Sequence, residues 1–411
     1  MTYFPKTKVE YSDSHNIDAF GKLRVSSHTN VFDSKQILDK DPDFWCELLS
    51  GSGTSSVHTA SLAQTVMTVP ASNGACAIRQ TKMRFNYTPG VSSLFYMSGR
   101  APPEANTIKR IGYFSSLTTA PYDPFDGIFF QMYGSVPSWN IALTGGIKSV
   151  PQSQWNLDKL DGTGPSNISA SYDNGQIWTF DFEWLGMGRV RCGQVIGGEF
   201  IYCHEFLHGN IEKNVYMGSP NLPLRYEIRS TGGAGSMTHI CSAIMSEGGS
   251  KSLGSYHSVS TKNTHVDANT IGTVYALCGI RLATESFVAQ IEPSNMSLLA
   301  LTNDAFQWKL LLNPVLTGSV NWVDHDGYEK AKVQEFSGSG QTITIANSGL
   351  GSGHVILQGY ASAQISDYLS IESELRIGVD ITGSRDTMVL AVVPFTSNAD
   401  IHGAFTWREL I

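Results

Sequence analysis

Residues 176–210 read QIWTFDFEWLGMGRVRCGQVIGGEFIYCHEFLHGN, and this stretch decides the fold. Aromatic residues fill every second position of its first part, namely Trp178, Phe180, Phe182 and Trp184. Between them stand Ile177, Thr179, Asp181 and Glu183. Because successive side chains of a strand point to opposite faces, the alternation predicts an antiparallel strand with one aromatic, buried face. The later glycines supply a bend and a hairpin turn, so the whole stretch predicts a three-stranded meander.

The end of this stretch contains a motif that is typical of zinc proteases. Residues 204–208 read HEFLH and fit the pattern H-E-x-x-H. In a zinc protease the two histidines share one face of a helix and bind one ion. Here the preceding residues indicate a strand, on which His204 and His208 would lie about 13 Å apart, too far for one ion. We therefore interpret His204, Glu205 and His208 as strand residues, and expect neither a metal nor a cofactor.

Two carboxylates in the aromatic strand suggest a second kind of chemistry. Asp181 and Glu183 are two residues apart on one strand face, and glycoside hydrolases use such a pair across a cleft. However, Arg189 and Arg191 follow one hairpin later, and cross-strand ion pairs would account for the carboxylates without catalysis. The second interpretation is favoured because the outer face of a strand is normally polar. We expect no catalytic residue and no enzyme.

Composition limits the possible classes of protein. The chain has 411 residues, of which 16% are charged and 40 are glycine. Short apolar alternations between Gly, Ser, Asn and Asp favour an all-β protein. The net charge of -8 disfavours nucleic-acid binding, and no apolar run is long enough to insert into a membrane. The six scattered cysteines are interpreted as buried thiols of a protein made in a reducing cytosol.

These patterns predict two antiparallel β-sandwich or jelly-roll domains, the first with concanavalin-like character, and an extended N-terminal arm. Residues 1–34 form the arm, residues 35–290 the larger sandwich and residues 291–411 the smaller one. The arm is polar, so it cannot fold alone. Its anchors are Phe20, Leu23, Arg24 and Val25. The arm is either a frayed terminus or a peptide that docks on another subunit.

Aromatic residues in the expected loops could contact sugars. Tyr122, Trp139 and Trp155 present flat apolar rings, which match the C–H faces of sugar rings. The alternative, which we favour, is that these rings fill the core beneath the loops.

Several long strings of this sequence resemble segments of a family of virion structural proteins from tailed bacteriophages. The similarity extends from about residue 18 to residue 249 and returns at the end in GAFTWREL. The strings are DAFGKLRVSS, AIRQTKMRFNYTPG, RIGYF, WNLDKLDGTGPS, QIWTFDFEWLGMGRVRCG, HEFLHGN, NLPLRYEIR and CSAIMSEGG. The resemblance implies a tail- or head-associated virion component, and it carries over no catalytic residue. It also implies that the arm is an anchor into the particle.

We therefore expect a virion structural protein of the tail, baseplate or fibre apparatus, made in the host cytoplasm. Its expected partners are further copies of itself, as a trimer or higher homo-oligomer, and other virion proteins. Two alternatives remain open. One is a head-attached decoration or fibre protein. The other is a receptor-binding protein that binds or degrades host glycans.

Overall fold

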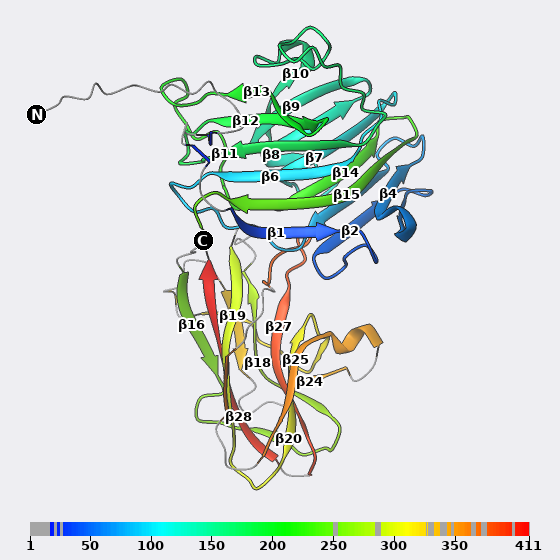
Figure 1. Ribbon diagram of the computed structural model, residues 1–411. Helices are drawn as coiled ribbons and strands as arrows, with labels where there is room; N and C mark the ends of the chain where they lie inside the picture. Colours follow the sequence, from blue (N-terminus) through cyan, green and yellow to red (C-terminus); the bar gives the residue numbers. More distant parts are fainter. Residues whose placement is uncertain are drawn as a thin grey trace, which may run out of the picture. The chain divides into compact units, whose positions relative to one another are not determined.

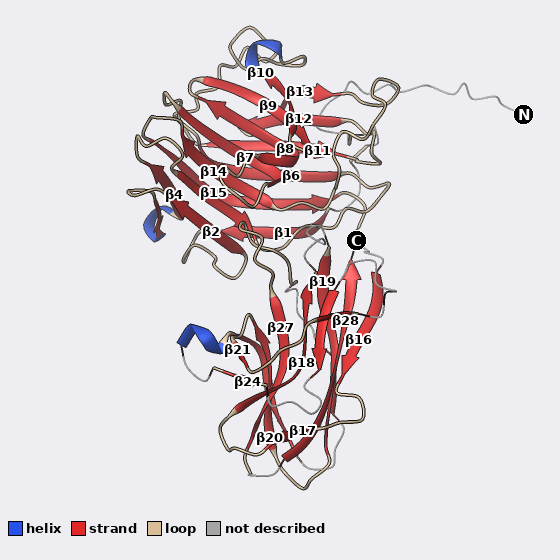
Figure 2. Cartoon of the chain, turned by 180° about the vertical axis from the view of Figure 1, so that it is seen from behind, coloured by secondary structure: helices blue, strands red, loops and turns tan. Residues whose placement is uncertain are grey.

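The structure is a computed structural model of the chain. It describes residues 17–19, 23–24, 28–249, 254–283, 289–325, 327, 333–337, 343–346, 349–362, 367–370, 376–396 and 399–410. The chain forms two compact units. Unit 1 comprises Met1–Thr81 and Tyr87–Lys251, and unit 2 comprises Lys82–Asn86 and Ser252–Ile411. Both units consist almost entirely of antiparallel strands (Figures 1 and 2).

Unit 1 contains two sheets. Within the described residues the first has eight strands, in the order β13-β12-β11-β6-β15-β4-β3, with β1 also paired to β15. Their bounds are β1 Thr29–Lys35, β3 Ser55–Thr59, β4 Gln64–Val69, β6 Ser93–Arg100, β11 Gln176–Phe182, β12 Val190–Ile196, β13 Glu199–Phe206 and β15 Gly235–Ser246. The predicted meander is therefore present as β11, β12 and β13 at one edge of this sheet.

The second sheet of unit 1 has seven strands in the described part of the chain, in the order β10-β9-β8-β7-β14-β5-β2. The strands are β2 Trp45–Ser50, β5 Cys76–Thr81, β7 Thr107–Ser116, β8 Pro124–Tyr133, β9 Val136–Leu143, β10 Gly146–Pro151 and β14 Leu224–Ser230. Two short 3-10 helices, η1 (Ala60–Leu62) and η2 (Gln152–Gln154), lie in connections.

Aromatic side chains fill the space between these two sheets. Phe95 of β6 stacks on Phe180 of β11, with ring centroids 4.6 Å apart, and also contacts Tyr113 of β7 at 4.7 Å. Trp178 of β11 contacts Phe130 of β8 at 5.3 Å. The aromatic face predicted for β11 is therefore the core face, and the intervening residues, including Asp181, point to the outer face of the first sheet.

Unit 2 is a second sandwich. One sheet has five strands in the described residues, ordered β16-β28-β19-β26 with β17 paired to β28. These are β16 Gly254–Ser260, β17 Val266–Ala268, β19 Gln290–Ala300, β26 Asp367–Ser370 and β28 Ala399–Leu410. The other has eight, ordered β21-β24-β18-β27-β20-β25, with β22 and β23 joined beside β18. These are β18 Val274–Leu282, β20 Phe306–Leu312, β21 Leu316–Thr317, β22 Val323–Asp324, β23 Val333–Ser337, β24 Thr344–Ile345, β25 His354–Ala361 and β27 Thr387–Pro394, and the 3-10 helix η3 spans Gly349–Ser352.

Strand β18 organises the core of unit 2. Leu277 belongs to the main core between the two sheets, together with Phe405 and Trp407 of β28. Ala276 points the other way and joins a smaller cluster with Phe336 of β23. Because β18 is buried on both faces, it has the continuous apolar sequence VYALCGIRL rather than an alternation.

The all-β sandwich class predicted from the sequence is confirmed, but the predicted boundaries differ. The sequence analysis placed the division near residue 290, whereas the compact units divide at residues 251 and 252. The reason is that β18 pairs with β23, β24 and β27, all of which follow it in unit 2. The arm expected to end at residue 34 is also shorter, because β1 is a strand of the first sheet.

The cysteines partly follow the expectation of buried thiols. All six are free, and Cys76, Cys192, Cys203 and Cys278 are buried. Cys241 is exposed and Cys46 is half-buried, so the expectation was wrong for these two. Among the described residues, no helix has the length and hydropathy needed to cross a membrane.

The aromatic core predicts unequal effects of two substitutions on the same strand. Phe180 is 1% exposed, whereas Ile177, on the opposite face of β11, is 39% exposed. We expect Phe180→Ala to lower the free energy of unfolding by about 3–5 kcal/mol. The control Ile177→Ala should cost less than about 1 kcal/mol. Urea unfolding of the full chain measures both, and equal losses would contradict the placement of the core.

Candidate functional site

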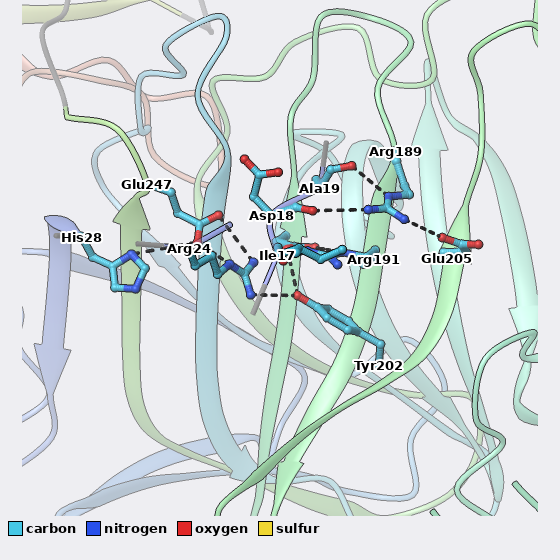
Figure 3. A network of polar contacts seen from close by, with 11 residues as sticks. Ile17, Asp18, Ala19, Arg24, His28, Arg189, Arg191, Tyr202, Glu205 and Glu247 are labelled. Atoms are coloured by element: carbon cyan, nitrogen blue, oxygen red, sulfur yellow. Dashed lines mark hydrogen bonds and ion pairs between the residues drawn. The ribbon is translucent and has the colours of Figure 1, made fainter. Parts of the chain in front are cut away.

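The outer face of the first sheet carries a network of charged residues that holds the described part of the N-terminal segment (Figure 3). We name this arrangement the N-terminal clasp. It comprises residues 17–19 and 23–24 together with Asp181, Arg189, Arg191, Tyr202 and Glu247. The sheet residues come from β11, β12 and β13, the meander that the sequence predicts, and from the residue that follows β15.

Asp181 is the centre of the clasp. Its side chain is fully buried, and it stands directly opposite Arg191 in the β11–β12 ladder. Arg191 binds both carboxylate oxygens, through Nε at 3.0 Å and Nη2 at 2.5 Å. Tyr202 donates its hydroxyl at 2.8 Å, and Nη2 of Arg24 forms a further ion pair. Bidentate and charge-assisted hydrogen bonds of this kind are the strongest that proteins form.

Arg24 connects the N-terminal segment to two carboxylates at once. Besides Asp181, its Nε forms an ion pair with Glu247 at 2.5 Å, and its Nη1 donates to the hydroxyl of Tyr202 at 3.1 Å. Its side chain is only 8% exposed. Burial alone would lower the pKa of the Arg24 guanidinium, but the charges of Asp181 and Glu247 and the hydrogen bond to Tyr202 raise it, so the group remains a cation.

Arg191 of β12 and Arg189, which directly precedes β12, hold the backbone of the N-terminal segment. Arg191 donates to the carbonyl of Ile17 at 2.7 Å. Arg189 donates to the carbonyls of Ala19 at 2.9 Å and Asp18 at 3.3 Å. Ile17, Asp18 and Ala19 are each less than a tenth exposed. The segment is therefore fixed through main-chain atoms, which any sequence would provide, as well as through Arg24.

The buried charges of the clasp balance. Asp18, Asp181 and Glu247 are three anions, and Arg24, Arg189 and Arg191 are three cations. Asp181, Glu247, Arg24 and Arg191 have side chains at most 8% exposed. A buried charge without a partner would cost several kcal/mol, so each of the four groups depends on the others. Stacking adds to this, because the Arg191 guanidinium lies 4.2 Å from the centre of the Tyr202 ring. Burial raises the pKa of Tyr202, which therefore remains a hydrogen-bond donor at neutral pH.

These contacts favour the interpretation of Asp181 as a partner in a cross-strand ion pair. The cross-strand pair of Asp181 with Arg191 is present, and Arg189 forms an ion pair with Glu205 at 3.3 Å. Asp181 is covered by Arg24 and Tyr202, so it cannot reach a sugar while the clasp is closed. The outer face carries polar residues, as the sequence analysis expects, and the N-terminal segment covers it around Asp181. Glu183 lies beyond the end of β11 and is 2% exposed.

The four arm residues named in the sequence analysis differ in where the structure places them. Arg24 is a central contact of the clasp, whereas Leu23 forms a bridge with Ile17 and is 42% exposed. Phe20 and Val25 lie outside the described residues. The described part of the arm docks on its own chain, whereas the sequence analysis left open a frayed terminus or docking on another subunit. Tyr202 and Glu247 were missed, because nothing in their local sequence distinguishes them from ordinary strand and turn residues.

The H-E-x-x-H motif lies on a strand and its end, as the sequence predicts. His204 and Glu205 belong to β13, and His208 follows it. Nδ1 of His204 accepts the backbone N–H of Asn156 at 3.3 Å. His208 donates from Nδ1 to the carbonyl of Gly188 at 2.7 Å and stacks on Tyr216, with centroids 4.1 Å apart. Each imidazole thus has a local structural contact.

Two of the three proposed sugar contacts are unavailable at the surface. Trp139 is fully buried in β9, where its indole N–H donates to Cys203, and Trp155 is 3% exposed and donates to the carbonyl of Val150. Both rings are buried, which confirms the favoured interpretation for these two residues and leaves neither ring available to a sugar. Tyr122 is half-buried and follows Pro121 in the loop before β8.

A pocket of about 300 Å³ also opens on the first sheet of unit 1. It is lined by Asp33, Ser34, Lys35, Tyr96, Ser98, Ile177, Cys241, Ser242 and Ala243. Lys35 and Asp33 pair with each other at 3.2 Å, and the Ser98 hydroxyl accepts the backbone N–H of Cys241. Its titratable groups therefore do not converge on a reaction centre.

Comparison with known proteins gives similarity of structure only. No protein-family model and no curated protein matches the sequence. Similar solved structures include a Bacillus licheniformis beta-glucanase, with 11% identity, 54% of this chain and 98% of that chain covered, and a TM-score of 0.33. The Emp47p carbohydrate recognition domain has 12% identity, coverages of 53% and 96%, and a TM-score of 0.35. A Shewanella oneidensis protein of unknown function has 10% identity, coverages of 60% and 100%, and a TM-score of 0.35. With such low TM-scores, these similarities carry no argument about function.

The clasp predicts a large effect of removing one charge. Asp181→Asn removes the buried negative charge that Arg24 and Arg191 share, so we expect a loss of about 3–5 kcal/mol in the free energy of unfolding. Trypsin should also cleave faster after Lys22 and Arg24, because the segment is released. Glu205→Gln removes the partly exposed partner of Arg189 and should cost less than about 1 kcal/mol. Similar losses in the two variants would refute the central role of Asp181.

The buried imidazole of His204 predicts a pH effect. Burial, aided by the charge of Lys148, lowers the pKa of His204 to about 4 from its ordinary value of 6.5. The unfolded chain therefore binds a proton between these values that the folded chain does not, and stability falls as the pH falls from 6.5 towards 4. His204→Gln should reduce this fall by up to about 1.4 kcal/mol per pH unit. Parallel stability curves, measured by urea unfolding from pH 7 to 5, would show that His204 is not the cause.

Proposed function

We propose that this chain is a non-enzymatic structural subunit of a tailed-phage virion, which assembles through its N-terminal residues and its β units. The tail, baseplate or fibre apparatus is the proposed location, with a head-attached decoration or fibre protein as the alternative. The observation that supports the proposal most strongly is the N-terminal clasp, because it commits the most charged part of the outer face to holding the N-terminal segment.

The sequence strings that resemble virion proteins meet in this clasp. DAFGKLRVSS supplies Asp18, Ala19 and Arg24, and QIWTFDFEWLGMGRVRCG supplies Asp181, Arg189 and Arg191. Two strings separated by more than 150 residues in sequence thus form a single physical unit. Such a pairing is expected if the family uses this segment to position its N-terminus. The two strings that carry the resemblance therefore also supply the residues that hold the N-terminal segment on the sheet.

The residues that suggested chemistry are already engaged in holding the fold. Asp181 neutralises two arginines, and His204 and His208 contact the backbone at their Nδ1 atoms. A catalytic acid or base must reach the proton that it transfers, and the buried position of Asp181 prevents this. This supports a structural role over a glycan-degrading one. The buried indoles of Trp139 and Trp155 likewise weaken the glycan-binding alternative.

In the proposed assembly the clasp fixes the start of an anchor. Residues 1–16 precede it and have the polar sequence MTYFPKTKVEYSDSHN. A polar segment with few apolar residues gains buried surface by packing on a partner. Because the clasp already fixes the position of residue 17, the segment loses less chain entropy when it binds that partner. The partners are neighbouring copies, in a trimer or higher homo-oligomer, and other virion proteins. The mature protein would be located in the virion.

The proposal predicts that assembly and folding can be separated. A chain lacking residues 1–16 retains the clasp, so it should unfold at the same urea concentration as the full chain. Its incorporation into particles, measured by quantitative blotting of purified virions, should fall at least tenfold. A chain in which residues 1–16 are replaced by an equally long Gly-Ser segment is the matched control for length and should fail in the same way.

Two outcomes would contradict the proposal. Normal incorporation of both variants would show that residues 1–16 are not an anchor. Degradation of host polysaccharide by the full chain, lost in Asp181→Asn at a pH and temperature where that variant is folded, would instead support the enzyme. Binding on a glycan array without degradation would support the receptor-binding alternative.

A further inference from the structure

A group of four polar side chains lies on one face of a sheet of unit 2. Strand β17 pairs with β28 so that Asp267 is directly opposite Asp400. His265 precedes Asp267 by two residues, and His402 follows Asp400 by two residues. Residues two apart on extended chain share a face, so the sequences His-x-Asp and Asp-x-His face each other in antiparallel orientation. The result is a four-residue group with two imidazoles and two carboxylates, which we name the His-Asp square.

The distances within the square are those of a set of metal ligands. Nε2 of His265 lies 2.8 Å from Oδ1 of Asp267 and 3.6 Å from Oδ1 of Asp400. One ligand atom from each of these three residues lies within 4.8 Å of the others. Ligands of a tetrahedral zinc ion, with bonds of about 2.0–2.2 Å, lie roughly 3.4 Å apart, so the observed distances require only small adjustments.

His402 lies beside these three residues but is not one of those whose ligand atoms lie within 4.8 Å of one another. Its ring is 6.0 Å from that of His265 and nearly perpendicular to it, at 83°. Two imidazoles that bind one ion have ring centres on the order of 5–6 Å apart. Nδ1 of His402 lies 3.0 Å from the hydroxyl of Thr261, which is 1% exposed. When Nδ1 carries the proton and donates it to that hydroxyl, the Nε2 lone pair is available to an ion, as in many metal sites where a second contact orients the ligand.

Without a bound cation, the carboxylates of Asp267 and Asp400 repel each other. Like charges directly opposite in an antiparallel ladder destabilise it. Within the described part of the chain, the ion pairs of Asp267 and Asp400 are with His265 alone. A bound cation would remove the repulsion.

We propose that His265, Asp267, Asp400 and His402 form a binding site for one divalent transition-metal ion, with zinc as the best match. Two imidazole nitrogens and two carboxylate oxygens are a ligand set that suits zinc. Calcium and magnesium require six or more oxygen ligands or several retained waters, and half of the donors here are nitrogen. The side chains are partly exposed, from 27% for Asp400 to 60% for Asp267, so an ion can enter from solvent.

The ion would stabilise the chain segment that connects β16 to β18. This connection contains β17, which is only three residues long and is held by its pairing with β28. Because two ligands come from each side of the β17–β28 ladder, a bound ion joins them independently of the backbone hydrogen bonds. Metal binding should therefore stabilise unit 2 and slow hydrogen exchange at residues 265–268.

The test is direct titration of the untagged full chain, freed of metal on a chelating resin, with zinc chloride at pH 7.5 by calorimetry. We expect one ion per chain with micromolar or tighter affinity, and a rise in the thermal midpoint of unfolding when zinc is present. His265→Ala and Asp400→Asn should each weaken binding at least tenfold, and His402→Ala should weaken it similarly. His354→Ala is the matched control, because His354 is an exposed histidine on β25 of the same unit.

Two results would contradict the proposed metal site. One is the absence of saturable binding by the wild-type chain. The other is binding that His265→Ala and Asp400→Asn leave as strong as in the control. Circular dichroism of each metal-free variant establishes that it is folded. If Asp400→Asn does not fold, the exposed Asp267→Asn replaces it in the comparison and must show the same loss of affinity.

Discussion

Asp181 has lost all contact with water, and its negative charge is therefore balanced by protein groups alone. Arg191 supplies the first cation from the neighbouring strand, and Arg24 supplies the second from a segment more than 150 residues away in sequence. Glu247 then balances the surplus positive charge. Because an unpaired charge is so costly in this environment, these four side chains are stable only together. This requirement determines where the N-terminal segment lies on the sheet.

The same requirement connects the fold to the proposed function. The chain's own N-terminal residues cover the Asp181 region of the sheet, and this gives the preceding residues a fixed starting point. The aromatic rings on the opposite side of β11 pack in the core, where Phe180 stacks on Phe95 of the neighbouring strand. A packed core on one side and a segment held by buried charges on the other suit the proposed role as a structural subunit. A site that must bind and release substrate would need a more accessible face.

Much of the fold could be predicted from the sequence, because alternation and glycine turns act locally. The aromatic strand, its two successors and the last strands of unit 2 all follow from such patterns. The domain boundary could not be predicted in this way, since β18 looks like any buried strand and only its long-range pairing assigns it to unit 2. The pair of Asp181 with Arg191 could be anticipated from their hairpin spacing. The contributions of Tyr202 and Glu247 depend on tertiary contacts and leave no local signal.

The most direct measurement of the central claim is a double-mutant cycle between Arg24 and Asp181. Arg24→Met, Asp181→Asn and the double variant are compared with the full chain by urea unfolding. If the two side chains depend on each other, the double variant loses less stability than the sum of the single losses, with a coupling energy of about 1–3 kcal/mol. Losses that add to within about 0.5 kcal/mol would show that Arg24 and Asp181 act independently, and the account of the clasp would be wrong.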